Sequence, residues 1–68
     1  MYHKKARLKQ PLDFKEPGKP QLYTSRRGTR VHVDRHEFDE GMYIVWLTAR
    51  KYALLNSDQL IEKIEFDL

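Results

Sequence analysis

The clearest pattern along the chain is the alternation of apolar and polar residues over positions 29–35. Val31 and Val33 fall on one side of an extended segment, whereas Arg30 and His32 fall on the other. Residues that recur with a period of two line one face of a β-strand. The segment is therefore predicted to be a strand with one face buried and the other in contact with solvent.

A second strand is predicted over residues 42–48, because this stretch is apolar at nearly every position. Apolar residues on both faces are typical of a central strand that is covered from two sides. Its aromatic residue, Trp46, is accordingly expected in the core. Residues 21–26 contain β-favouring types, and Arg27-Gly28 after them predicts a turn, since glycine adopts positive φ at no steric cost.

The C-terminal third allows two interpretations. Residues 52–55 predict a further strand, and the alternation of apolar and acidic residues from Ile64 to Leu68 predicts a closing strand after a single helical turn. Leu60, Ile61, Ile64 and Leu68 also fit one helical face, however, and Asn56 with Gln59 fits a helix N-cap and its reciprocal partner. The strand interpretation is the one we favour from the sequence.

The first twenty residues differ from the rest in composition. They contain six basic residues and all three prolines, with few apolar side chains to bury. Residues 16–20 have turn chemistry, because proline fixes φ and makes the preceding residue extended. The sequence therefore predicts a loose basic arm over residues 1–20 and one small β-rich domain over residues 21–68.

These elements predict a mainly β fold, a small SH3-like or Sm-like antiparallel barrel or a curled sheet of four or five strands, with a short C-terminal helix as an option. The alternative is an α+β fold, a three-stranded meander covered by a C-terminal helix. A chain of 68 residues has room for one core. Because it contains no cysteine, disulfides and thiolate metal sites are excluded, and association with a partner or a second copy is an alternative source of stability.

Charge is distributed unevenly along the chain. Residues 1–35 contain ten Lys and Arg against three Asp and Glu, a net +7, whereas residues 36–68 contain three against seven, a net −4. A segregated basic half is typical of proteins that bind polyanions. The same asymmetry would also allow two copies to pair head to tail.

The basic residues predict a nucleic-acid surface, since arginine matches phosphate oxygens with two hydrogen bonds and also stacks on bases. Our leading hypothesis is a non-enzymatic accessory or regulatory module that binds RNA or DNA without a cofactor. The alternative is a protein–protein interaction module, such as a small adaptor or inhibitor of a phage or other mobile element, with an acidic protein surface or a larger host protein as its partner. The candidate binding residues are Arg26, Arg27, Arg30, Arg35, Lys4, Lys5, Arg7, Lys9, Tyr23 and His32.

Other classes of function are disfavoured. His32, Asp34 and His36 would lie on one strand face, but ligands spaced by two residues stand about 7 Å apart, too far to converge on one metal ion. The chain has no glycine-rich phosphate loop, nucleophile elbow or paired-carboxylate motif, so no enzymatic activity is predicted. No apolar run is long enough to span a bilayer, and no signal-peptide apolar region follows the N-terminal lysines, so we expect a cytoplasmic protein with no membrane partner.

Overall fold

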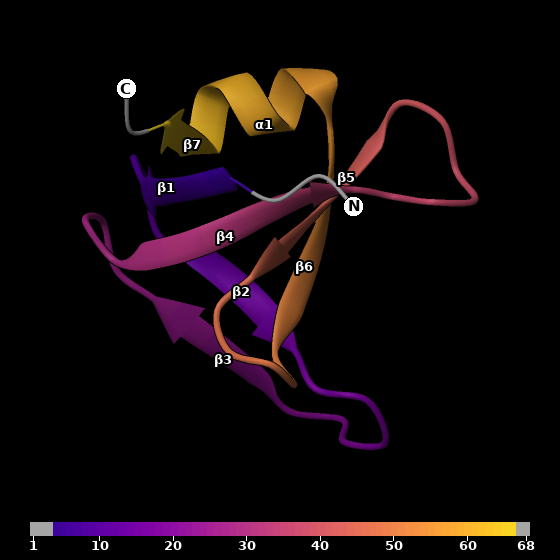
Figure 1. Cartoon of the computed structure of the whole chain (residues 1–68). Coiled ribbons are helices and arrows are strands. Elements are labelled where there is room, and N and C mark those ends of the chain that lie inside the picture. Colours follow the sequence, from indigo (N-terminus) through magenta and orange to yellow (C-terminus); the bar gives the residue numbers. More distant parts are fainter. Residues whose placement is uncertain (1–3, 67–68) are drawn as a thin grey trace.

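The computed structural model describes residues 4–66, which form one curled, half-barrel sheet of seven antiparallel strands and a single short helix (Figure 1). Neighbouring strands follow the order β3-β2-β6-β5-β4-β1-β7. The elements in chain order are β1 (Lys4–Leu8), β2 (Leu12–Lys15), β3 (Leu22–Ser25), β4 (Arg30–Arg35), β5 (Met42–Trp46), β6 (Tyr52–Asn56), α1 (Ser57–Lys63) and β7 (Ile64–Phe66).

The mainly β class predicted from the sequence is confirmed, and the three-stranded α+β alternative is not what the described residues form. The five strands expected from the sequence correspond to β3, β4, β5, β6 and β7. The count of seven exceeds the predicted four or five because β1 and β2 lie in the segment that was expected to be an arm.

The first two strands correct the expectation of a loose arm over residues 1–20. Ala6 and Leu8 of β1 and Phe14 of β2 are buried in the core, and Phe14 is fully inaccessible. The physical reason is a period of two that the many basic residues conceal. Apolar side chains at alternate positions face the core, whereas Lys5 and Arg7 between and beside them face solvent.

β1 and β2 are the two halves of one bent ribbon. Ala6 lies opposite Val31 on β4. Phe14, eight residues after Ala6, lies opposite Tyr23 on β3, which is eight residues before Val31. Residues 4–15 therefore run against residues 22–33 in a single register. At the bend, Gly28 adopts a φ of +89° and its N–H donates to the carbonyl oxygen of Leu8 at 2.8 Å, a conformation that suits glycine.

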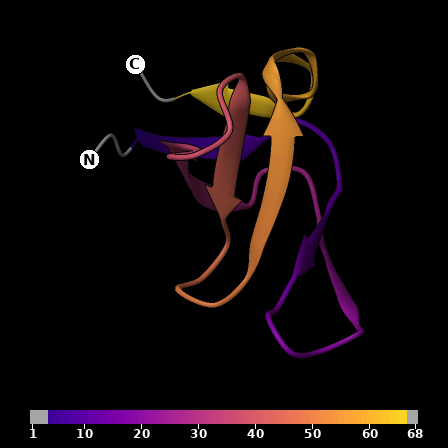
Figure 2. The same ribbon diagram turned by 90° about the vertical axis from the view of Figure 1, so that its right-hand side faces the viewer.

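The bend gives each half of the ribbon a different neighbour. β1 pairs with β4 and β7, whereas β2 pairs with β3 and touches β6 at one register position, Lys15 opposite Tyr52. β4, β5 and β6 form an antiparallel meander between these two halves. Figure 2 shows β5 and β6 side by side, with the loops of residues 16–21 and 47–51 at the same end of the molecule. The result is a sheet that curls around one core.

Helix α1 closes one end of the curled sheet (Figure 1), where Leu60 enters the core. The predicted N-cap is confirmed: Asn56 Oδ1 accepts the N–H of Gln59 at 2.8 Å, and Gln59 Oε1 accepts the N–H of Asn56 at 3.0 Å. The helix ends where β7 begins at Ile64. Each interpretation of the C-terminal segment therefore holds for part of it, and Leu68 lies outside the described residues.

Candidate nucleic-acid interface

The side of the sheet that faces away from the core, which we call the outer face, carries a group of basic side chains from β1 and β4. Lys5 and Arg7 alternate with buried residues of β1, and Arg30 and His32 alternate with buried residues of β4. The register places Lys5 opposite His32 and Arg7 opposite Arg30. Four of the candidate residues are thus brought together in two adjacent cross-strand pairs.

The outer face also carries a row of side chains that begins at His32 and includes two aromatic rings. His32 lies opposite Trp46, Trp46 lies opposite Tyr52, and Tyr52 lies opposite Lys15, so the row crosses β4, β5, β6 and β2. The ring centroids of Trp46 and Tyr52 are 5.6 Å apart and their planes are inclined by 52°. Both residues are half-buried, so the sheet supports each ring and part of each side chain remains accessible to solvent.

The position of Trp46 corrects the expectation that residues 42–48 form a strand covered on both faces. Val45 is the fully buried residue of β5, and the side chains at alternate positions, Ile44 and Trp46 among them, remain partly exposed on the outer face. On β6, Leu54 lies opposite Ile44 and is 42% exposed. The core takes up one side of this apolar strand, and the other side supplies a surface.

Two candidate residues are separated from the outer face. Lys4 lies opposite Val33 on the core side of the sheet, and its Nζ is 5.9 Å from the ring centroid of Phe66. Arg35, two residues after Val33, lines the same cavity of about 300 Å³ as Lys4 and Phe66. These two cations therefore mark a different surface from the one that Lys5 and Arg30 share.

Two further candidates contact other parts of the chain. The Nζ of Lys9 donates to the carbonyl oxygen of Ile61 at 2.9 Å, so this cation lies at the C-terminal end of α1, where its charge favours the helix dipole. Tyr23 packs against the core, and the Nζ of Lys51 is 4.2 Å from the centroid of its ring. We therefore leave both residues out of the proposed interface.

Arg26 and Arg27 lie in the turn between β3 and β4, and both are exposed. The turn is held by Thr29, whose N–H and hydroxyl both donate to the carbonyl oxygen of Arg26, at 3.2 Å and 2.7 Å. These two arginines flank the outer face at the bend of the ribbon.

The sequence predicts Trp46 in the core, leaves Tyr52 open between the core and an exposed stacking platform, and does not mark Lys15 as a binding residue. The alternation of side chains along a strand identifies these residues. If Val45 is buried, Trp46 points to the other face, and a tight connection to residues 52–56 places Tyr52 beside it. Residues 42–46 form a strand that is apolar along its length, as predicted. Burial of both its faces would require another element to cover each face, and the core covers one of them.

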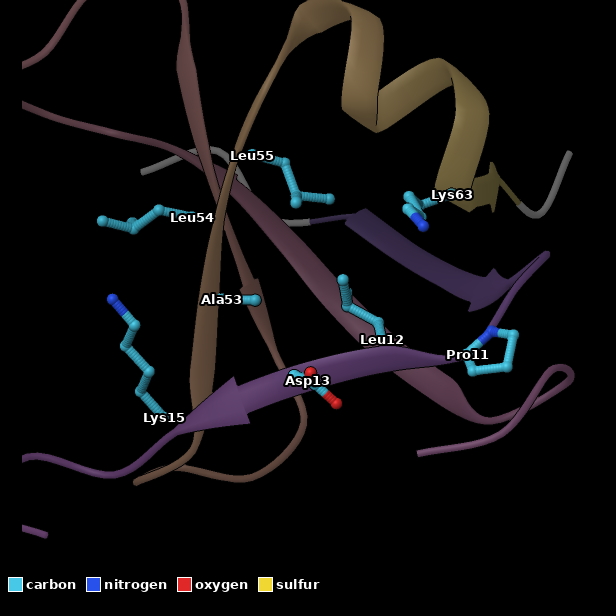
Figure 3. A pocket seen from close by; sticks show the side chains of 8 residues that line it. All are labelled: Pro11, Leu12, Asp13, Lys15, Ala53, Leu54, Leu55 and Lys63. Atoms are coloured by element: carbon cyan, nitrogen blue, oxygen red, sulfur yellow. The ribbon is translucent and has the colours of Figure 1, made fainter. Parts of the chain in front are cut away.

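A hollow of about 470 Å³ lies where β2 and β6 diverge from the Lys15–Tyr52 pair (Figure 3). Two of its polar side chains are already engaged, since Asp13 accepts a hydrogen bond from the Thr24 hydroxyl and Lys63 Nζ donates to Gln10 Oε1 at 3.1 Å. None of the described residues that line it is aromatic. The residues around it are Pro11, Leu12, Asp13, Lys15, Ala53, Leu54, Leu55 and Lys63.

Within residues 4–66, no group of three or more His, Cys, Asp or Glu side chains is placed to hold a metal ion, and no helix is long and apolar enough to cross a membrane. Comparison with protein-family models, with curated proteins and with solved structures finds no match to this chain.

Proposed function

We propose that the chain is a non-enzymatic accessory or regulatory module that binds nucleic acid through its outer face. The observation that carries this proposal is the cross-strand row in which the His32 imidazole and the Lys15 ammonium group flank the rings of Trp46 and Tyr52. Aromatic platforms bordered by cations are how proteins bind single strands, because the rings stack on bases and the cations neutralise the backbone.

The cations supply the contacts to phosphate. Arg7 and Arg30 lie directly opposite each other, an arrangement of like charges that costs a sheet stability. Glu65, opposite Arg7 on the other side, offsets part of this charge. A phosphate bound between the two guanidinium groups would offset it further and would accept paired hydrogen bonds from each.

The rings supply contacts to bases that depend little on sequence, since every base has a π-face. Trp46 and Tyr52 belong to strands that pair over five register positions, so the rings are held by a well-formed part of the sheet. Such a platform costs little conformational entropy when a base stacks on it.

A matched pair of double variants tests the proposal. Lys5→Ala with Arg30→Ala removes two cations from the outer face, whereas Lys4→Ala with Arg35→Ala removes two cations from the core-side cavity. Anisotropy titrations of labelled single- and double-stranded oligonucleotides at two salt concentrations should show a loss of roughly tenfold or more for the first pair and about twofold for the second. Absence of binding at low salt, or equal losses for the two pairs, would reject the proposal.

One observation favours protein docking as a second candidate function. Phe38, in the loop between β4 and β5, is 90% exposed and lies between Glu37 and Asp39. The loop is ordered by hydrogen bonds from Phe38 N to His36 Nδ1 at 3.2 Å and from Met42 N to the carbonyl oxygen of Asp39 at 3.2 Å. An exposed ring among carboxylates suits a protein pocket bordered by lysine and arginine.

This second candidate predicts a stoichiometric protein complex that survives nuclease treatment. Phe38→Ala should abolish the complex and leave affinity for oligonucleotides unchanged. A complex that Phe38→Ala leaves intact would show that the loop is not the docking element.

A further inference from the structure

A shallow cavity of about 340 Å³ opens beside Trp46 and Tyr52, where two strands and two loops meet. The rings of Trp46 and Tyr52 line it from β5 and β6, and the loops of residues 16–21 and 47–51 complete it at the end of the molecule where both loops lie (Figure 2). Its lining residues are Glu16, Pro17, Trp46, Ala49, Arg50 and Tyr52. The cavity thus combines flat apolar walls with one carboxylate and one guanidinium group.

The carboxylate is the group that gives this cavity specificity. Glu16 Oε2 is 2.9 Å from Lys19 Nζ, and the Glu16 side chain is only 14% exposed. The hydrogen bond from Lys19 lowers the pKa of Glu16, and the nearby charges of Lys51 and Arg50 act in the same direction. Glu16 is therefore ionised at neutral pH and acts as a hydrogen-bond acceptor. Its two oxygens offer about four acceptor positions, of which Lys19 uses one.

We infer that this cavity binds one unpaired nucleobase that carries an exocyclic amino group, within a single strand held by the outer face. The base stacks against Trp46 or Tyr52, its amino group donates to Glu16, and Arg50 contacts the adjoining phosphate. The inference rests on the proposed function, which it deepens by naming the kind of strand and the kind of base.

The chemistry of the bases explains the preference. A carboxylate accepts hydrogen bonds from the amino group of cytosine, and adenine and guanine also carry such groups. Uracil and thymine have a carbonyl oxygen where cytosine has its amino group, and a carbonyl oxygen facing an ionised carboxylate leaves two acceptors without a donor. The cavity should therefore favour cytosine, adenine and guanine, of which the first two are tested below, over thymine and uracil.

The geometry also explains a preference for single strands. In a duplex the bases are stacked on each other and their pairing edges are occupied, so a base cannot stack on Trp46 or Tyr52 without first leaving the stack of the duplex. The single strand already exposes both the face and the edge of each base. Duplex binding through phosphates alone is expected to be weaker and to leave the rings untouched.

The test uses the intrinsic fluorescence of Trp46, the only tryptophan in the sequence. The full chain is titrated with oligo(dC), oligo(dA), oligo(dT), oligo(rC) and oligo(rU) of equal length. We expect cytosine and adenine strands to quench the fluorescence and to bind at least about tenfold more tightly than thymine or uracil strands, a difference typical of one buried hydrogen bond to a charged group. The deoxyribose and ribose arms show whether the preference is independent of the sugar.

Two variants separate the role of the carboxylate from that of the ion pair. Glu16→Gln should reduce the preference to about threefold or less while affinity for oligo(dT) is retained. Lys19→Gln removes the same ion pair but keeps the carboxylate, so the preference should persist. Equal affinity of the unmodified chain for oligo(dC) and oligo(dT), or a preference that Glu16→Gln leaves intact, would overturn the inference.

The outcome also distinguishes failure of the cavity from failure of the proposed function. Binding that lacks base preference but still depends on Lys5 and Arg30 would reject the base site and leave the outer-face proposal standing. Absence of binding to every oligonucleotide at low salt would reject both.

Discussion

Trp46 and Tyr52 lie directly opposite each other across β5 and β6, with ring centroids 5.6 Å apart, on the side of the sheet that faces away from the core. A ring in the core would contribute mainly to stability. A half-buried ring on the outer face can be replaced with little cost to the fold, so its loss should appear mainly in binding.

Replacement of Tyr52 by leucine tests this directly, since leucine retains apolar area and removes the ring. We expect the free energy of unfolding to change by less than about 1 kcal/mol, and binding to a single strand to weaken by about 1–3 kcal/mol, the usual contribution of one stacked base. Urea denaturation and anisotropy titration measure the two quantities. Unchanged affinity would show that the ring does not contact the ligand.

Phe14 provides the opposite case, because it is fully buried in a segment whose composition predicts an arm. Phe14→Ala should cost about 3–5 kcal/mol, which is comparable to the whole stability expected from so small a core. The variant should therefore be largely unfolded by circular dichroism. Lys15→Ala, the exposed neighbour, is the control and should fold normally; a folded Phe14→Ala protein would contradict the packing described.

Lys9 and Lys5 should respond in opposite ways to the same change. Lys9→Met removes a cation from the end of α1 and should lower the free energy of unfolding by about 0.3–1 kcal/mol, with little effect on binding. Lys5→Met should leave stability nearly unchanged and reduce the slope of log affinity against log salt by about 0.7 for a single strand. The reverse assignment of the two effects would place Lys9 at the interface.

The ion pair between Glu16 and Lys19 predicts a pH dependence with a definite sign. The hydrogen bond from Lys19 lowers the pKa of Glu16 in the folded state. A lowered carboxyl pKa adds stability above the unfolded-state pKa, and this contribution is lost as the pH falls through the folded-state value. Carboxyl-carbon NMR should show the Glu16 midpoint moving upward in Lys19→Gln, with no movement for Glu40; an unmoved Glu16 midpoint would mean that the pair is not formed.

Local chemistry allowed much of this fold to be predicted from the sequence. The alternation at Val31 and Val33, the turn at Gly28 and the N-cap at Asn56 each depend on neighbouring residues, and all three are observed. Local patterns failed where burial depends on distant partners. Ala6 has a small side chain and Leu8 is one of few apolar residues in its segment, so the local sequence does not mark them as core residues. Only the pairing of β1 with β4 and β7 shows that they complete the core.

The candidate site was predictable in part for the same reason. Strand parity places Arg30 and His32 on one face, as expected, but whether Lys5 joins them depends on a pairing across 27 positions of the chain. Lys9 has the same charge as Lys5, and its engagement with α1 follows from tertiary contacts that composition does not encode. Trp46 was assigned to the core because apolar runs do not reveal which of their faces is covered.

The pairing of β1 with β7 has a consequence for the order of assembly. Ala6 lies opposite Val31 on one side and opposite Phe66 on the other, so β1 has one neighbour 25 positions away along the chain and another 60 positions away. The ribbon and the meander can form first, but one edge of β1 stays open until β7 docks. Contacts between such distant positions slow folding, and an open edge is prone to pair with other chains. Docking of β7 thus replaces the five-residue edge of β1 with an edge of three residues, and short edge strands are less prone to pair with other chains.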